Sequence, residues 1–108
     1  MPSLPAAFSA LGNSTRFAIV ERLLKDGEFA AGEFLKKGAM SPPAMSHHFK
    51  VLRQAGIVRQ RIDKQRRMYS VRPEAVRAIG AWSLSYRHFW GGSLGRLEAA
   101  LGKEGEGP

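Results

Sequence analysis

The sequence contains no cysteine. This absence excludes disulfide bonds, thiol redox sensing, cysteine-ligated zinc and cysteine nucleophiles. No apolar run approaches the roughly 20 residues that a membrane span needs. Residues 1–5 also lack the basic region followed by an apolar stretch that marks a signal peptide. We therefore expect a cytoplasmic protein.

Residues for catalysis are lacking as well. No serine stands in a Gly-x-Ser-x-Gly elbow, and no glycine-rich loop of the phosphate-binding type is present. The nine acidic residues are scattered along the chain. Without a pair of carboxylates or a nucleophile beside a base, the chain offers no candidate catalytic residues, and we expect that it is not an enzyme.

What is present suits one small globular domain. The chain has 108 residues, of which 44% are hydrophobic and 24% are charged. We expect a single domain over residues 1–101. Residues 102–108 are rich in glycine and charge, and are predicted to form a disordered tail.

The charge is strongly positive and unevenly distributed. Lysine and arginine number 17 against nine acids, a formal net charge of +8. Residues 41–72 contain only one acid, Asp63, and eight cations: Lys50, Arg53, Arg59, Arg61, Lys64, Arg66, Arg67 and Arg72. A basic stretch of this kind is either a solvated surface or a contact surface for a polyanion.

Apolar spacing predicts four helices in the first half of the chain. Helices are expected over residues 4–11, from Asn13 or Ser14 to about Asp26, around residues 31–35, and from Ser41 to Gly56. The apolar stripe of the first helix is Leu4, Ala7, Phe8 and Leu11, and the third helix carries Ala31, Phe34 and Leu35 on one face. The second helix is expected to bury Phe17, Val20, Leu23 and Leu24, and the fourth is expected to bury Met45, Phe49 and Leu52. Gly38 is a predicted C-terminal residue of the third helix.

The second half begins with a predicted β-hairpin. Strands are expected over residues 57–62 and 67–72, joined by a turn at residues 63–66. A last helix is expected from Pro73 to Leu101, with Gly91 and Gly92 as its predicted break or kink.

This order predicts a mainly α fold with a small β-hairpin, a winged helix-turn-helix. The third and fourth helices are joined by only four residues, Gly38–Ser41, which is typical of a helix-turn-helix. The second helix of such a unit enters the major groove of DNA. Double-stranded DNA is therefore the expected partner.

Two motifs resemble the ArsR/SmtB family of bacterial transcriptional repressors. Residues 8–17, FSALGNSTRF, are similar to that family's F-x-A-L-x-[DN]-x-T-R opening. Residues 41–58, SPPAMSHHFKVLRQAGIV, resemble its S-x-x-[AT]-[VI]-S-[HQ]-H-L-K-x-L-x-x-A-G-L-V segment. The resemblance implies a symmetric homodimer that represses transcription by occupying an operator, which two-fold symmetry makes palindromic.

The fourth helix and the hairpin supply the predicted DNA contacts. Ser46 and His47 lie in the first turns of the helix and can read base edges, whereas Lys50 suits phosphate. Pro43 departs from the polar residue of many family members. The predicted DNA-binding residues are Ser41, Pro43, Ala44, Ser46, His47, Lys50, Arg53, Lys64, Arg66 and Arg67. His48 is interpreted as a histidine at the edge of the core that forms a local hydrogen bond.

No metal site or other cofactor is expected. Adjacent histidines such as His47 and His48 point about 100° apart on a helix and rarely share an ion. The metal sensors of the family carry cysteines where this chain has residues 29–34, or ligands on the last helix, where this chain has only His88.

The last helix is rich in aromatic residues, which allow three interpretations: ordinary core, a dimer seam, or a pocket for a small organic inducer. We favour the seam. Its predicted residues are Leu4, Phe8, Leu11, Trp82, Tyr86, Phe89, Trp90, Leu94 and Leu97. The sequence thus predicts a dimeric repressor. The alternatives are a non-specific basic nucleic-acid-binding module, or a repressor that an organic ligand releases from DNA.

Overall fold

A computed structural model describes residues 3–35 and 40–92. The predictions for Gly38, Leu94, Leu97, Leu101 and the tail concern residues outside these ranges. The chain divides into two compact units, Met1–Arg77 and Ala78–Pro108, and each is described by itself. Within the described residues, no helix combines the length and the apolar character that crossing a membrane would require.

The first unit contains four helices before the wing: α1 (Leu4–Leu11), α2 (Ser14–Asp26), α3 (Ala31–Leu35) and α4 (Pro42–Gln54). Local side chains determine where three of them begin. Ser3, Asn13 and Ser41 are the N-caps of α1, α2 and α4, and each accepts a backbone N–H with its side-chain oxygen. The predicted helices at these positions are confirmed.

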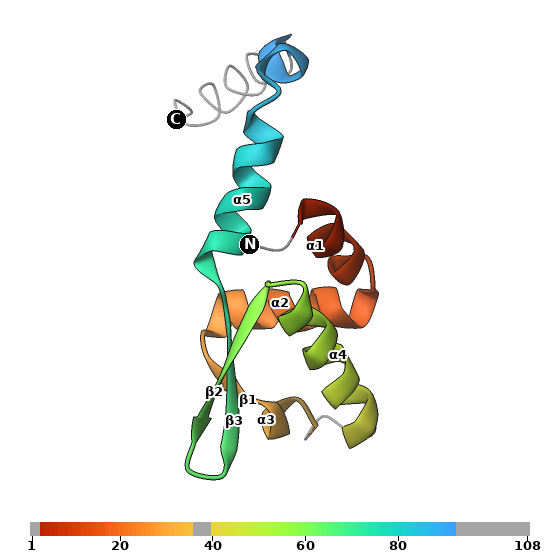
Figure 1. Ribbon diagram of the computed structural model, residues 1–108, viewed down its shortest axis with the longest axis vertical. Helices are drawn as coiled ribbons and strands as arrows, with labels where there is room; N and C mark the ends of the chain where they lie inside the picture. The colour runs from red at the N-terminus through yellow and green to blue at the C-terminus, as the bar shows by residue number, and fades with distance from the viewer. Residues whose placement is uncertain (1–2, 36–39, 93–108) are drawn as a thin grey trace, which may run out of the picture. The chain divides into compact units, whose positions relative to one another are not determined.

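The strands form a three-stranded antiparallel sheet in the order β1-β3-β2 (Figure 1). Strand β2 (Val58–Asp63) and strand β3 (Arg66–Val71) make the predicted hairpin, and Lys64 adopts a positive φ of 60° in its two-residue turn. Strand β1 (Phe29–Ala30) was not predicted. It has only two residues, too few for an alternating pattern to reveal, and it exists because it pairs with β3.

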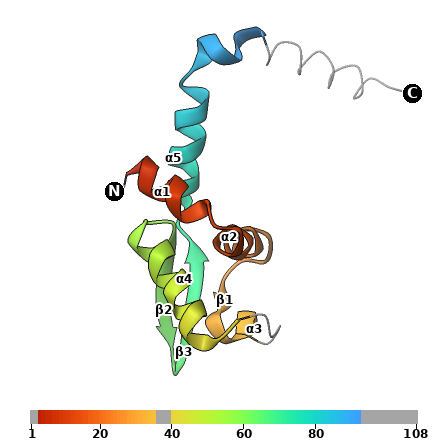
Figure 2. The ribbon, with the colours of Figure 1, turned by 90° about the vertical axis from the view of Figure 1, so that its right-hand side faces the viewer.

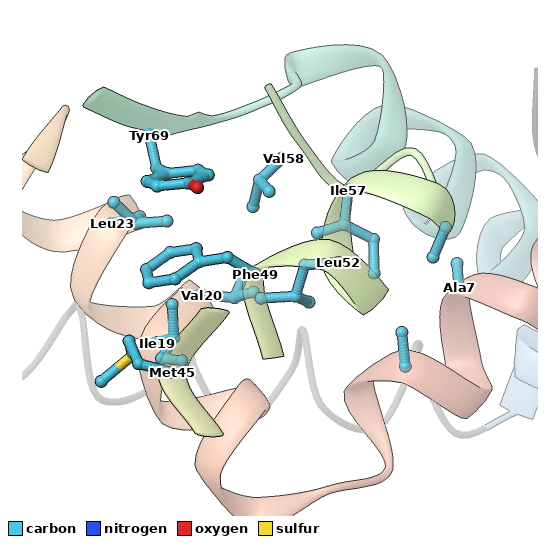
Figure 3. Close-up of a cluster of buried hydrophobic side chains, with 12 residues drawn as sticks. Ala7, Ile19, Val20, Leu23, Met45, Phe49, Leu52, Ile57, Val58 and Tyr69 are labelled. Atoms are coloured by element: carbon cyan, nitrogen blue, oxygen red, sulfur yellow. The ribbon is translucent and has the colours of Figure 1, made fainter. Parts of the chain in front are cut away.

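The core of the first unit lies between α1, α2, α4 and the sheet (Figure 3). Phe49, Leu52, Ile57 and Val58 are almost completely buried. The predicted core residues Met45, Val20 and Leu23 are buried too. Burial of this apolar surface is the main force that holds these helices and the sheet together.

Two core predictions on α2 were wrong. Phe17 and Leu24 are 49% and 55% exposed, whereas Ile19, which was not predicted, is 4% exposed. The buried stripe of α2 is Ile19, Val20 and Leu23, so the helix is rotated away from the expected register. The sequence misled because apolar residues occur on both sides of this helix.

Helix α5 (Pro73–Leu84) begins at Pro73 as predicted but is shorter than expected. It ends at Leu84, and residues 87–92 form a separate helical stretch. Gly91 and Gly92, where the sequence allowed a kink or a break, are both helical, and the interruption that the structure shows lies at residues 85–86. Side chains donate hydrogen bonds to carbonyl oxygens at the end of α5. The Ser85 hydroxyl donates to Trp82 O, and the Trp90 indole N–H donates to Ser83 O, each at 2.7 Å.

Candidate nucleic-acid interface

The N-terminal end of α4 is exposed to solvent. Ser41 is extended, with φ −72° and ψ 154°, and its Oγ accepts the Ala44 N–H at 3.3 Å. Pro42 follows at the first helical position, where its missing N–H costs nothing. The helix therefore begins sharply at an exposed point, where Pro42 and Pro43 have no N–H and the Ala44 N–H is already bonded to the Ser41 side chain.

The two faces of α4 differ completely. Met45, Phe49 and Leu52 are buried against the unit. The opposite face carries polar and basic side chains that are all exposed: Ser46, His47, Lys50 and Arg53. Pro43 is exposed at the start of the helix, and Ala44 is half-buried there. The structure thus brings seven of the predicted contact residues together on one helix.

Aromatic rings hold α4 in place. The Phe49 ring stacks on Tyr69 of β3, with centroids 3.9 Å apart (Figure 3). It also meets Phe34 of α3 edge-on, with centroids 5.5 Å apart. Tyr69 in turn donates its hydroxyl to Gln60 Oε1 at 2.8 Å. The helix that carries the polar face is therefore fixed to both α3 and the wing.

His48 lies half-buried at the edge of the core, but the hydrogen bond that it makes is not local. Its Nδ1 lies 3.3 Å from Nη1 of Arg16 on α2, 32 positions away in the chain. Partial burial lowers the pKa of His48, and the positive charges of Arg16 and His47 lower it further. His48 thus stays neutral where an exposed histidine begins to be protonated.

The wing extends the same surface. The N-terminal end of α4 and the tip of the β2–β3 hairpin lie at the same end of the first unit in both views (Figures 1 and 2). Successive residues of a strand face opposite sides of the sheet. Arg67 shares the side of Tyr69, which stacks on α4, whereas Arg66 shares the side of Met68, which faces the other way.

The cations of the wing differ in their partners. Arg61 is held by Glu28 through two hydrogen bonds of 2.7 and 2.6 Å, which lower the pKa of Glu28 and raise that of Arg61. Arg66 lies 4.0 Å from Asp63, and Arg72 lies 3.6 Å from Glu74. Of the five predicted DNA-binding cations, all of them among the described residues, only Arg66 has an ion pair, and Lys50, Arg53, Lys64 and Arg67 have none. Among the predicted contacts, these four are therefore the cations most available to phosphate.

Sequence reasoning missed two residues of this surface. Arg16 was part of a quoted motif, but nothing in its spacing indicated that it would reach His48, 32 positions away. Glu28 belongs to no predicted helix or strand, and no local pattern indicates its contact with Arg61, which forms where β1 pairs with β3. Both contacts depend on tertiary structure.

The second unit presents a separate aromatic cluster. Trp82 and Tyr86 meet edge-on with centroids 5.9 Å apart, and Phe89 and Trp90 do so at 5.2 Å. Around them lies an open pocket of about 310 Å³, lined also by Ser83. Trp82, Tyr86 and Phe89 are 46%, 57% and 74% exposed, and Trp90 is half-buried. In the first unit, Phe8 is 41% exposed, whereas Leu4 and Leu11 are partly buried.

No metal site emerges in the part of the chain that the structure describes. It contains no group of three or more histidine, cysteine, aspartate or glutamate side chains able to hold an ion. The His47 and His48 rings lie 6.0 Å apart and are tilted by 56°.

Comparisons with known proteins agree with this geometry. Residues 11–61 match the family model of a helix-turn-helix domain. The chain is 36% identical to the HTH-type transcriptional regulator Rv2034 of Mycobacterium tuberculosis over 93% of its length and 90% of the relative's. It is 30% identical to the transcriptional repressor SdpR of Bacillus subtilis over 73% of its length and 87% of the relative's.

A similar fold is found in a crystal structure of an ArsR family transcriptional regulator, RHA00566. The TM-score is 0.73 and the identity 28%, over 81% of this chain and 94% of that one. Fold and relatives together define a transcriptional regulator with a winged helix-turn-helix DNA-binding domain, rather than an enzyme. The chain belongs to the ArsR family.

Proposed function

We propose that the protein is a homodimeric repressor that occupies a palindromic operator and so blocks a promoter. In each protomer α4 lies in the major groove, where Ser46 and His47 contact base edges. The relative SdpR is itself named a transcriptional repressor, which supports the direction of regulation.

The observation that carries this proposal is the division of α4 into two faces. Its apolar face is almost completely buried, so the helix cannot turn to hide its polar side. Its exposed face begins at a capped N-terminus and offers hydrogen-bonding groups first and cations one turn later. That order suits base contacts at the start of the helix and phosphate contacts beyond it.

The dimer is supported by apolar side chains that remain exposed in a single copy. Phe8, Trp82, Tyr86 and Phe89 are each more than two-fifths exposed. A second copy that covers these side chains would remove them from water. Leu94 and Leu97 are proposed members of the same seam.

The proposal is tested by first selecting the DNA sequence that the protein prefers and then measuring the affinity of a variant for it. The wild-type protein selects duplexes from a random-sequence library, and the selected duplex is compared with a scrambled one. We expect an inverted repeat, and we expect His47→Ala to lower affinity for it by about 1–3 kcal/mol with little effect on the scrambled duplex. Equal losses on both duplexes would instead favour a non-specific nucleic-acid-binding module.

A second function is favoured by the pocket of about 310 Å³ in the second unit. Its aromatic lining suits a planar organic inducer, and the indole N–H of Trp90 is already used by Ser83 O. Titration of planar aromatic compounds against tryptophan fluorescence tests binding. Release of the selected duplex by the same compound would establish induction.

A further inference from the structure

Arg16 joins three parts of the first unit. The Asn13 side chain caps α2 by accepting the Thr15 and Arg16 N–H groups at 2.9 and 3.1 Å. From that position the Arg16 Nε donates to the carbonyl of Ala10, near the end of α1, at 2.7 Å. Its Nη1 points to His48 of α4 at 3.3 Å. One guanidinium thus connects the α1–α2 corner to the helix that presents the polar face.

This contact requires a particular form of His48. A guanidinium only donates hydrogen bonds, so the Nδ1 of His48 must accept and can carry no proton. The neutral ring with its proton on Nε2 meets that condition. A protonated ring would set an N–H donor and a positive charge against Arg16.

Among the described residues, none pairs with His48 in a way that would stabilise a protonated ring. The charged or titratable neighbours of His48 are Arg16 on α2 and His47 on its own helix, and both lower its pKa. No carboxylate of the described residues pairs with it.

We propose that His48 is a positioning residue, whose neutral ring holds α4 against Arg16 in the orientation that reads DNA, so that protonation of His48 weakens specific binding in mildly acidic solution. The inference rests on the proposed function, because it assumes that α4 is the helix that reads DNA. His48 itself touches no base. It acts through Ser46 and His47, which lie beside it on the exposed face of the same helix.

The neighbouring histidine provides a matched control. His47 is exposed on the proposed DNA face of the same helix. Substituting each histidine in turn with glutamine, which does not titrate, separates the contribution of His48 from that of His47.

The first measurement is affinity for the selected duplex between about pH 5.5 and pH 7.5, across the ordinary titration range of histidine. The side-chain carbonyl of glutamine can accept from Arg16, so we expect His48→Gln to bind like wild type near pH 7.5. His48→Ala should bind about two- to tenfold more weakly there, the equivalent of one lost hydrogen bond. At the acidic end His48→Gln should exceed wild type by a similar factor.

Two further variants sharpen the result. His47→Gln should still lose affinity on acidification, because His48 and Arg16 are unchanged in it. Arg16→Lys keeps the charge but removes the fork that reaches Ala10 and His48, and its effect should not add to that of His48→Ala. Parallel pH profiles for wild type and His48→Gln would overturn the proposal.

A measurement without DNA separates this inference from the proposed function. In the free, full-length protein, imidazole nitrogen NMR shifts should show His48 with its proton on Nε2 and a pKa below the ordinary value of about 6.5. A proton on Nδ1, or an ordinary pKa, would refute the inference even if DNA binding is specific. A wild-type protein with no preference for the selected duplex at pH 7.5 would refute the proposed function instead.

Discussion

The ring of Phe49 stacks on the ring of Tyr69, with centroids 3.9 Å apart and planes inclined by 20°. Phe49 belongs to α4 and Tyr69 to β3, so the contact joins the proposed recognition helix directly to the wing. Both side chains are almost completely buried. The helix and the wing are therefore positioned by one packed contact rather than by a flexible connection.

Replacing Phe49 by alanine should lower the free energy of unfolding by about 3–5 kcal/mol, because it removes a fully buried ring from a packed core. Chemical denaturation followed by circular dichroism measures the loss. Phe17→Ala is the matched control, since Phe17 is 49% exposed and should lose far less. Equal losses for the two variants would contradict the core described for this unit.

Substitutions of two serines, Ser41 at the N-cap of α4 and Ser46 within the helix, should separate an effect on stability from an effect on DNA binding. Ser41 caps the helix through its bond to the Ala44 N–H, so Ser41→Ala should lower the free energy of unfolding by about 1 kcal/mol. Ser46 is exposed within the helix, and Ser46→Ala should leave stability unchanged while weakening binding to the selected duplex. Denaturation and binding titrations on both variants test the distinction.

Local signals predicted much of the fold. The cap Ser41, the cap of α2 at Asn13 or Ser14 and the position of the wing turn are visible in the sequence, because each depends on neighbouring residues. The turn itself is shorter than the predicted residues 63–66, because Asp63 and Arg66 pair as the last residues of the two strands. The polar face of α4 was predictable for a related reason. Its buried residues recur every three to four positions, which fixes the opposite face as well.

Features that depend on distant residues were not predictable. Strand β1 needs β3 as its partner, and the bond between Arg16 and His48 joins residues that only the folded chain brings together. The end of α5 at Leu84 was hidden because Ser85 is an ordinary helix residue in sequence terms. At that end of the helix, the indole N–H of Trp90 donates a hydrogen bond to the carbonyl oxygen of Ser83, seven residues earlier in the chain.

Replacing Phe89 by aspartate should convert the protein to monomers or cause it to aggregate, because the dimer seam is proposed to cover this 74% exposed ring. Sedimentation equilibrium at micromolar concentration measures the state of assembly. Gln65→Asp is the control, since it adds the same charge at the exposed wing turn, which is not among the proposed seam residues. A folded wild-type monomer at that concentration would count against the homodimer.

Two of the arginines of the wing, Arg61 and Arg67, should differ in their effect on salt dependence. Arg67 lies on the α4 side of the sheet and has no ion pair among the described residues, whereas Arg61 is held by both oxygens of Glu28. Each phosphate contact releases counterions, so losing one reduces the slope of log affinity against log salt by about one.

Arg67→Ala should therefore reduce that slope by about one on selected and scrambled duplexes alike, and Arg61→Ala should leave it nearly unchanged. Glu28→Gln provides the complementary test. It leaves the Arg61 guanidinium without its carboxylate, so affinity for both duplexes should rise and become more sensitive to salt. Binding titrations at several salt concentrations measure all three variants. If Arg61→Ala reduced the slope as much as Arg67→Ala, Arg61 would be a phosphate contact despite Glu28, and the division of the wing into paired and available cations would be wrong.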